Sequence, residues 1–155
     1  MPDRLFAPVW LVMQLGALGS ALAAAGAASL KGRHRLALRL LKAGTITWAS
    51  SKVVKRVARR GRPAALLHDV RHRGKPARGM GYLSGHAGVA VALAGSTFPE
   101  VGWRARLILL TLAPLVGLAR VYVGAHLPLD VAGGAALGLV VEGLVSLREA
   151  RRQST

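Results

Sequence analysis

The sequence predicts an all-α fold, a polytopic transmembrane helical bundle of about five spans. The composition and the positions of the charges predict it. Hydrophobic residues make up 52% of the 155 residues, yet the formal net charge is +16. A basic nucleic-acid-binding protein rarely carries so many apolar residues, and an aromatic content of 5% leaves few rings for stacking bases. We therefore expect apolar helices with cationic ends, whose partner is the membrane bilayer and not a nucleic acid.

The length of the chain gives room for one domain, which we expect to cover residues 1–155. The chain has no cysteine, so a disulfide framework and a thiolate metal site are excluded. The composition leaves the oligomeric state open.

Two predicted spans rest on stretches with few or no ionisable groups. Residues 5–30 carry none, and as a helix they reach about 39 Å, enough to cross a hydrocarbon core of roughly 30 Å with some tilt. Residues 79–99 have Tyr82 and His86 as their only titratable groups, and we predict a span over 84–98. The first stretch is also similar to a signal peptide. Its apolar run exceeds the roughly 7–15 residues of a signal core, so we expect a retained helix.

Three further spans are predicted from weaker signals. A span over 105–124 contains a long run without charge, whereas a span over 129–148 is interrupted by Asp130 near its start and Glu142 near its end. Ionisable groups at membrane depth are costly, and we interpret Glu142 as the structural partner of a nearby cation. The weakest span is 36–59, whose cations include Arg39, Lys42, Lys52 and Lys55.

The longest connection, residues 61–83, is rich in glycine and proline, the residues typical of turns. Residues 64–72 within it are a candidate short interfacial helix. His68, Asp69 and His72 superficially resemble a metal-binding pair on a helix, but no third ligand is placed nearby. We interpret them as solvated loop residues and expect neither a metal ion nor another cofactor.

We expect the candidate functional residues on one face of the membrane. If the chain crosses five times, the second and fourth helices end on the same face on which the third and fifth helices begin. Ionisable groups near membrane depth favour a functional interpretation. Lys55 and Arg62 are seven positions apart, two helical turns, so we expect them on one helix face about 10 Å apart. Pro63 pushes Arg62 out of the helical region and ends the helix there. Both side chains then reach one anion, although the pair alone also fits snorkelling cations.

Ser84, Gly85 and His86 open the third span directly after the glycine-rich connection. Ser84 is a good N-cap, and the free backbone N–H groups of the first turn form an anion site. Gly85 has no side chain to obstruct a phosphate, and His86 would stand beside the bound anion. Taken alone, His86 also fits a structural polar contact at a helix start.

Arg120, His126 and Asp130 surround the connection between the last two spans. Pro128 suits the first position of a helix, and Asp130 then lies in the first turn, where the helix dipole favours its charge. From there we expect Asp130 to accept a hydrogen bond from His126, leaving the other ring nitrogen free to attack. This is the arrangement of base and orienting group found in nucleophilic catalysis.

Together, these residues resemble the tripartite signature of the type 2 phosphatidic acid phosphatase superfamily: Lys55-(six residues)-Arg62-Pro63, Ser84-Gly85-His86 and Arg120-(five residues)-His126-(three residues)-Asp130. The superfamily contains lipid phosphate phosphatases, bacterial polyprenyl diphosphate phosphatases and soluble vanadium haloperoxidases. Agreement at nine positions arises by chance on the order of once in a million sequences or less. Leu83 stands where the family usually has proline, and Ala119 where it often has serine. The family core commonly has six crossings, and the earliest one is missing here or lies upstream.

The resemblance implies a role for each residue. Five bind the phosphoryl oxygens through side chains or backbone: Lys55, Arg62, Ser84, Gly85 and Arg120. His126 attacks phosphorus in line and Asp130 orients it, while His86 protonates the leaving oxygen and later activates water to hydrolyse a phosphohistidine. Phosphoryl transfer needs positioning and neutralisation of charge, so three fixed cations replace metal ions in this chemistry.

By the same resemblance, the substrate is an amphiphilic lipid phosphate: a polyprenyl phosphate or diphosphate, phosphatidic acid or phosphatidylglycerophosphate. A composition rich in Ala, Arg and Gly favours a high-GC bacterium and therefore a polyprenyl carrier of cell-wall synthesis. The resemblance also implies a multi-pass protein of the bacterial inner membrane with an extracytoplasmic active site. The charges do not decide the orientation, because both faces are too basic for the positive-inside rule to distinguish them. The alternative is a non-catalytic lipid-phosphate binding or transport domain on the same fold, which the intact histidines disfavour.

Overall fold

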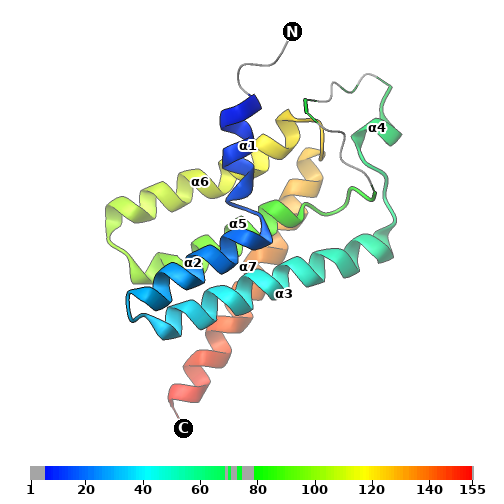
Figure 1. The fold of residues 1–155 in the computed structure, drawn as a ribbon. Helices are drawn as coiled ribbons and strands as arrows, with labels where there is room; N and C mark the ends of the chain where they lie inside the picture. Colours follow the sequence, from blue (N-terminus) through cyan, green and yellow to red (C-terminus); the bar gives the residue numbers. More distant parts are fainter. Residues whose placement is uncertain (1–5, 69, 71–72, 75–78, 155) are drawn as a thin grey trace.

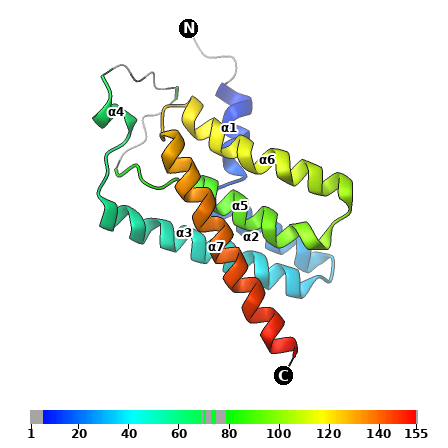
Figure 2. The ribbon, with the colours of Figure 1, turned by 180° about the vertical axis from the view of Figure 1, so that it is seen from behind.

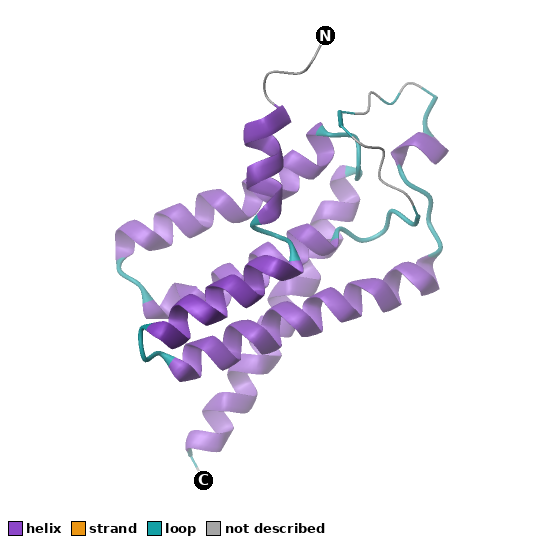
Figure 3. Cartoon of the chain, viewed as in Figure 1, coloured by secondary structure: helices purple, strands orange, loops and turns teal. Residues whose placement is uncertain are grey.

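The structure, a computed structural model, describes residues 6–68, 70, 73–74 and 79–154, and every regular element among them is a helix. The predicted all-α class is confirmed (Figures 1 and 3). The elements are α1 (Phe6–Gln14), α2 (Leu18–Leu30), α3 (His34–Ala58), α4 (Pro63–Leu66), α5 (Gly85–Thr97), the 3₁₀ helix η1 (Phe98–Glu100), α6 (Trp103–Tyr122) and α7 (Pro128–Gln153).

The helix α5 is the centre of the bundle and packs against α3, α6 and α7. Figure 2 shows α7 crossing α5 and α3 on its way to the C-terminus, at the end of the molecule opposite α4. A Cβ atom on Gly134 would overlap the Ser84 carbonyl, and one on Gly138 would overlap the Gly88 carbonyl. Small residues at such positions let helix backbones approach in lipid, where apolar burial gives little drive. Glycine on α7 therefore sets how closely α7 lies against α5.

The predicted first span, 5–30, is wrong as a single helix, because α1 and α2 meet at an angle of 61°. Gly16 lies in the link between them, and any side chain there would overlap the His86 carbonyl. The hydroxyl of Ser20 donates to the Ala17 carbonyl at 2.6 Å at the start of α2. The break thus brings the link into contact with the start of α5.

The other four predicted spans are confirmed as helices. The bounds of α3, α5 and α6 lie within two residues of the predicted ones, whereas α7 continues five residues beyond position 148. Charged residues end the apolar stretch of α7 without ending its helix. The candidate interfacial helix is shorter than predicted, because Leu67 after α4 has extended backbone (φ −131°, ψ 141°). Asp69 and His72 lie outside the described residues.

The apolar helices identify a membrane protein. By length and composition, α6 and α7 are able to cross a membrane, and α1 with α2 forms a third candidate if the bent pair is one broken span. The helix α5 has 13 residues, about 20 Å, which is shorter than a hydrocarbon core, and α3 carries several cations. The exact number of crossings therefore stays a prediction.

Glu142 joins α7 to α3. Its Oε1 atom lies 3.0 Å from Nη2 of Arg39 and accepts a hydrogen bond of 2.6 Å from the hydroxyl of Ser146. The side chains of Arg39 and Glu142 are 16% and 17% exposed. The predicted structural pairing of Glu142 with a cation is confirmed, and this ion pair lies outside the candidate site.

Candidate active site

Most of the predicted site residues line one pocket of about 320 Å³. It lies between the α1–α2 link, α3, the start of α5, the end of α6 and the α6–α7 connection. Its lining includes Gly16, Ala17, Leu18, Trp48, Ser51, Lys52, Lys55, Arg62, Gly85, His86, Arg120 and His126. Ser84 and Asp130 have no exposed surface and lie beside this lining. All eight candidate residues are therefore gathered at one end of the bundle.

Lys55 and Arg62 reach the pocket by a route that differs from the prediction. The helix α3 ends at Ala58, and Arg59 turns the chain with a left-handed backbone (φ 47°), so the two cations do not share a helix face. Arg62 is extended, as expected for a residue before proline. Its Nη1 donates to the Ala125 carbonyl at 2.8 Å, which ties this loop to the α6–α7 connection. Burial lowers the pKa of Arg62, and the charge of Asp130 partly offsets this.

Ser84 caps α5 as predicted, and its hydroxyl accepts a bond of 3.4 Å from the Ala87 N–H. The Ser84 N–H donates to the Asp130 carbonyl at 2.8 Å, which joins the start of α5 to the start of α7. A Cβ on Gly85 would lie 2.8 Å from the Ser51 hydroxyl. Glycine at this position therefore permits the approach of α3 and exposes backbone N–H groups to the pocket, where they favour an anion.

His126 and Asp130 face one another, with His126 Nδ1 3.5 Å from Asp130 Oδ2. The predicted hydrogen bond is not formed at this distance. Instead, Asp130 Oδ2 accepts a bond of 2.8 Å from the Leu127 N–H, because Asp130 is the third residue of α7 and reaches back to its N-cap. Pro128 is the first residue of α7, as predicted. The side chains of His126 and Asp130 are 1% and 0% exposed.

The electrostatic surroundings of His126 favour its neutral form. The residue lies in the connection between α6 and α7, where burial lowers its pKa and the charges of Arg120 and Arg62 lower it further. A lowered pKa leaves the ring unprotonated at neutral pH. With Nδ1 turned toward Asp130, Nε2 is the nitrogen that remains available to the pocket.

Arg60 is a residue of this site that the sequence did not reveal. Its Nη1 lies 3.6 Å from Asp130 Oδ1, on the carboxylate oxygen that does not face His126. The guanidinium also lies over the Tyr82 ring, 5.7 Å from the centroid. Arg60 is one of several arginines between Lys55 and Pro63, and its proximity to Asp130 depends on the turn after α3. The sequence carries no signal that separates it from the others.

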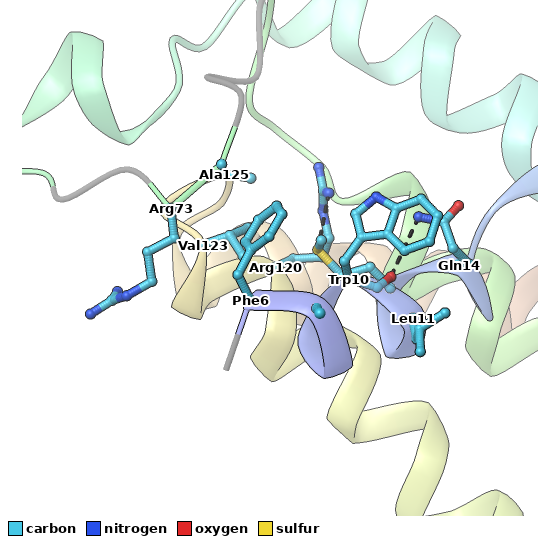
Figure 4. A pocket seen from close by; sticks show the side chains of 11 residues that line it. Phe6, Trp10, Leu11, Gln14, Arg73, Arg120, Val123 and Ala125 are labelled. Carbon is cyan, nitrogen blue, oxygen red and sulfur yellow. Dashed lines mark hydrogen bonds between the residues drawn. The ribbon is translucent and has the colours of Figure 1, made fainter. Parts of the chain in front are cut away.

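A second, largely apolar pocket of about 1,050 Å³ shares Arg120 with the first as a lining residue. Figure 4 shows Phe6, Trp10 and Leu11 of α1 among its lining side chains, together with Arg120. The guanidinium of Arg120 contacts Met13, whose sulfur lies 3.4 Å from Nη1. A thioether is a weak acceptor, so an anionic oxygen is able to replace it at little cost.

The described residues contain no group of three or more His, Asp or Glu side chains arranged to hold a metal ion. Asp69 and His72 of the loop alternative fall outside the described part of the chain, so the interpretation of those residues stays a prediction.

The fold and the pocket define an all-helical membrane protein with a cationic site that contains two histidines. The family model of the PAP2 superfamily matches residues 15–153, and the chain belongs to this superfamily. This confirms the family that the motifs indicated.

Two crystal structures share the fold. LpxE from Aquifex aeolicus has a TM-score of 0.83 and 24% identity, over 91% of this chain and 84% of LpxE. The first transmembrane PAP2 type phosphatidylglycerolphosphate phosphatase from Bacillus subtilis has a TM-score of 0.73 and 23% identity, over 97% of this chain and 79% of that one. None of the curated proteins matches the chain in sequence.

Proposed function

We propose that the chain is a single-domain membrane phosphatase, covering residues 1–155, which releases phosphate from a lipid phosphate or diphosphate through a phosphohistidine. The observation that carries the proposal is the pocket, in which several cations, a helix N-terminus and two histidines meet. Binding an anion requires only the cations and the helix start. Two histidines from different elements beside that anion are what a nucleophile and a general acid require.

In the first half-reaction, Nε2 of His126 attacks the phosphorus, and the bond from phosphorus to the lipid oxygen breaks. His86 gives that oxygen a proton, so the lipid leaves as an alcohol or as a lipid monophosphate. Lys55, Arg62 and Arg120 neutralise the phosphoryl oxygens. Asp130 supports this role for His126, because its carboxylate lies 3.5 Å from Nδ1 and stabilises the positive charge that the ring gains.

In the second half-reaction, water attacks the phosphohistidine and the bond between nitrogen and phosphorus breaks. His86, which has lost its proton, takes one from the water, and inorganic phosphate leaves. The enzyme returns to its starting protonation state, and the overall reaction is hydrolysis of one phosphorus–oxygen bond. All the charge neutralisation comes from side chains and backbone, so the proposed mechanism is independent of metal ions.

Apolar surfaces beside the pocket support an amphiphilic substrate. Leu18 and Trp48 lie at its lining, and the larger apolar pocket adjoins Arg120. A water-soluble phosphate ester would leave both surfaces unused. The substrate class we propose is therefore a lipid phosphate such as a polyprenyl phosphate or diphosphate, phosphatidic acid or phosphatidylglycerophosphate.

Purified protein in detergent is expected to release inorganic phosphate from at least one lipid of such a panel. Excess chelator is expected to change the rate of phosphate release by no more than about twofold, because fixed cations neutralise the phosphate. Phosphate release is the measurement, and His126→Ala purified in parallel controls for contaminating phosphatases. A complete loss in chelator that zinc or magnesium restores would contradict metal independence. Binding of the lipids without hydrolysis would favour the non-catalytic alternative.

We further propose a multi-pass arrangement in the bacterial inner membrane, with the pocket on the extracytoplasmic side. Because the native chain has no cysteine, single cysteines report topology directly. Leu67→Cys, near the pocket end, is expected to react with an impermeant maleimide in intact cells, whereas Ser154→Cys, after α7, reacts only after permeabilisation. Both positions are exposed. Equal labelling of the two in intact cells would contradict the arrangement.

A further inference from the structure

Lys52 lies at the rim of the phosphate pocket and has no role in the mechanism above. It lines the pocket three residues before Lys55, about 4.5 Å earlier along α3 and on nearly the same face. Its Nζ lies 5.2 Å from the centroid of the Trp48 ring. The side chain is exposed, whereas Lys55 and Arg120 are half-buried. No carboxylate among the described residues pairs with it.

The charge of the pocket exceeds what a phosphate monoester needs. A monoester carries about −1.5 to −2 near neutral pH. The pocket already offers Lys55, Arg62 and Arg120, and no carboxylate is among its lining residues. Lys52 raises the number of lining cations to four. A lipid diphosphate, whose second phosphate adds roughly one further negative charge, matches this set better than a monoester does.

The direction of the reaction places the second phosphate on the side of Lys52. In phosphoryl transfer the attacking and leaving groups are roughly in line through phosphorus. His126 belongs to the α6–α7 connection, which lies above the start of α5 in Figures 1 and 2, and α3 lies below it in both. The leaving group therefore points away from His126, toward the part of the lining that α3 provides, which contains Trp48 and Lys52.

We infer that Lys52 binds the non-reacting phosphate of a lipid diphosphate, and that this chain prefers lipid diphosphates to monophosphates. The inference rests on the proposed function and specifies its substrate class. The terminal phosphate binds to the inner cations, and the phosphate bonded to the lipid lies beside Lys52 at the mouth. The lipid chain then leaves past Trp48 and Leu18.

With a diphosphate, the reaction exchanges one phosphorus–oxygen bond for one phosphorus–nitrogen bond. Nε2 of His126 bonds to the terminal phosphorus, and the bond from that phosphorus to the bridging oxygen breaks. The bridging oxygen leaves on the lipid monophosphate with the proton of His86. Negative charge builds up on the departing phosphate as the bond breaks, and Lys52 stabilises it there. Lys52 therefore contributes to the rate with a diphosphate as well as to its binding.

The test compares the diphosphate and the monophosphate of the same polyprenol. Lys52→Gln is expected to lower kcat/KM for the diphosphate about 10-fold or more, the scale of one lost charged hydrogen bond, and for the monophosphate only roughly two- to threefold through the weaker field. Lys52→Arg is expected to keep the wild-type ratio. Arg56→Gln is the matched control: it removes one exposed cation from the same helix outside the pocket lining, and the ratio should not change.

Binding without turnover separates this inference from the proposed function. Methylenediphosphonate and methylphosphonate bind without a cleavable phosphorus–oxygen bridge, and their dissociation constants are measured for wild type and Lys52→Gln. Selective weakening of the diphosphonate supports the inference even if no lipid of the panel is hydrolysed. An equal loss for both substrates and both phosphonates would overturn it, as would a wild-type enzyme that hydrolyses the monophosphate as efficiently as the diphosphate.

Discussion

His126→Ala is expected to abolish both lipid phosphate turnover and the covalent intermediate, a loss of roughly 10⁴-fold or more, because it removes the attacking nitrogen. His86→Ala retains that nitrogen and loses the proton donor and the later base, so turnover of lipid substrates should fall roughly 10²–10⁴-fold. An aryl phosphate needs little protonation as its bond breaks. Its first half-reaction in His86→Ala should therefore be partly rescued, while hydrolysis of the intermediate stays slow.

Rapid-quench experiments with labelled aryl phosphate measure the acid-labile phosphohistidine in each variant. We expect it to accumulate in His86→Ala and to be missing from His126→Ala. His68→Ala, an exposed histidine outside the pocket, is the control and should behave as wild type. A phosphoenzyme in His126→Ala would show that another group attacks. Failure of His86→Ala to form one from the activated substrate would show that the roles of the histidines are assigned wrongly.

Asp130→Asn is expected to lower kcat roughly 10²–10⁴-fold with little change in KM, because the amide no longer fixes the ring of His126 or stabilises its positive charge. Arg60 acts through Asp130 as a positioning residue, since its guanidinium lies 3.6 Å from Asp130 Oδ1. Arg60→Ala should lower kcat about 10-fold, the lower end of what outer-shell partners contribute. Its side chain is 28% exposed, so water replaces part of the lost interaction.

The double variant decides whether Arg60 acts through Asp130. If it does, Arg60→Ala should cost little in the Asp130→Asn background, and the effects on kcat should be far from additive. Arg60→Lys is expected to recover part of the activity, and Arg56→Ala, which is exposed on α3, to retain all of it. Additive losses would instead mean that Arg60 contributes independently, and a fall in the thermal unfolding midpoint parallel to kcat would indicate a structural role.

The candidate site was predictable from the sequence to the level of its residues. Motif spacing named eight positions, and the structure places all of them at one pocket or directly beside it. The helix starts were also predictable, because a serine N-cap and a proline at the first helical position affect only the next three or four residues. Ser84 and Pro128 occupy those positions in α5 and α7.

What the sequence could not predict depends on contacts between distant segments. The apolar stretch 5–30 has no charge to mark a break, and the link that contains Gly16 packs closely against the His86 carbonyl of α5. The convergence of Lys55 and Arg62 was expected from one helix face but comes from the left-handed turn at Arg59. Arg60 was missed because its proximity to Asp130 depends on that turn and not on its position in the sequence.

The close contact between α5 and α7 has a consequence for engineering. His86 lies on α5 and Asp130 in the first turn of α7, and the contacts at Gly134 and Gly138 leave no room between these helices for a longer side chain. Libraries that vary Gly134 and Gly138 would mostly yield chains that do not fold, because even one methyl group at either position overlaps the backbone of α5 or its N-cap. Leu18 and Trp48 line the rim on α2 and α3 away from these two glycines, so new lipid selectivity is best sought at Leu18 and Trp48.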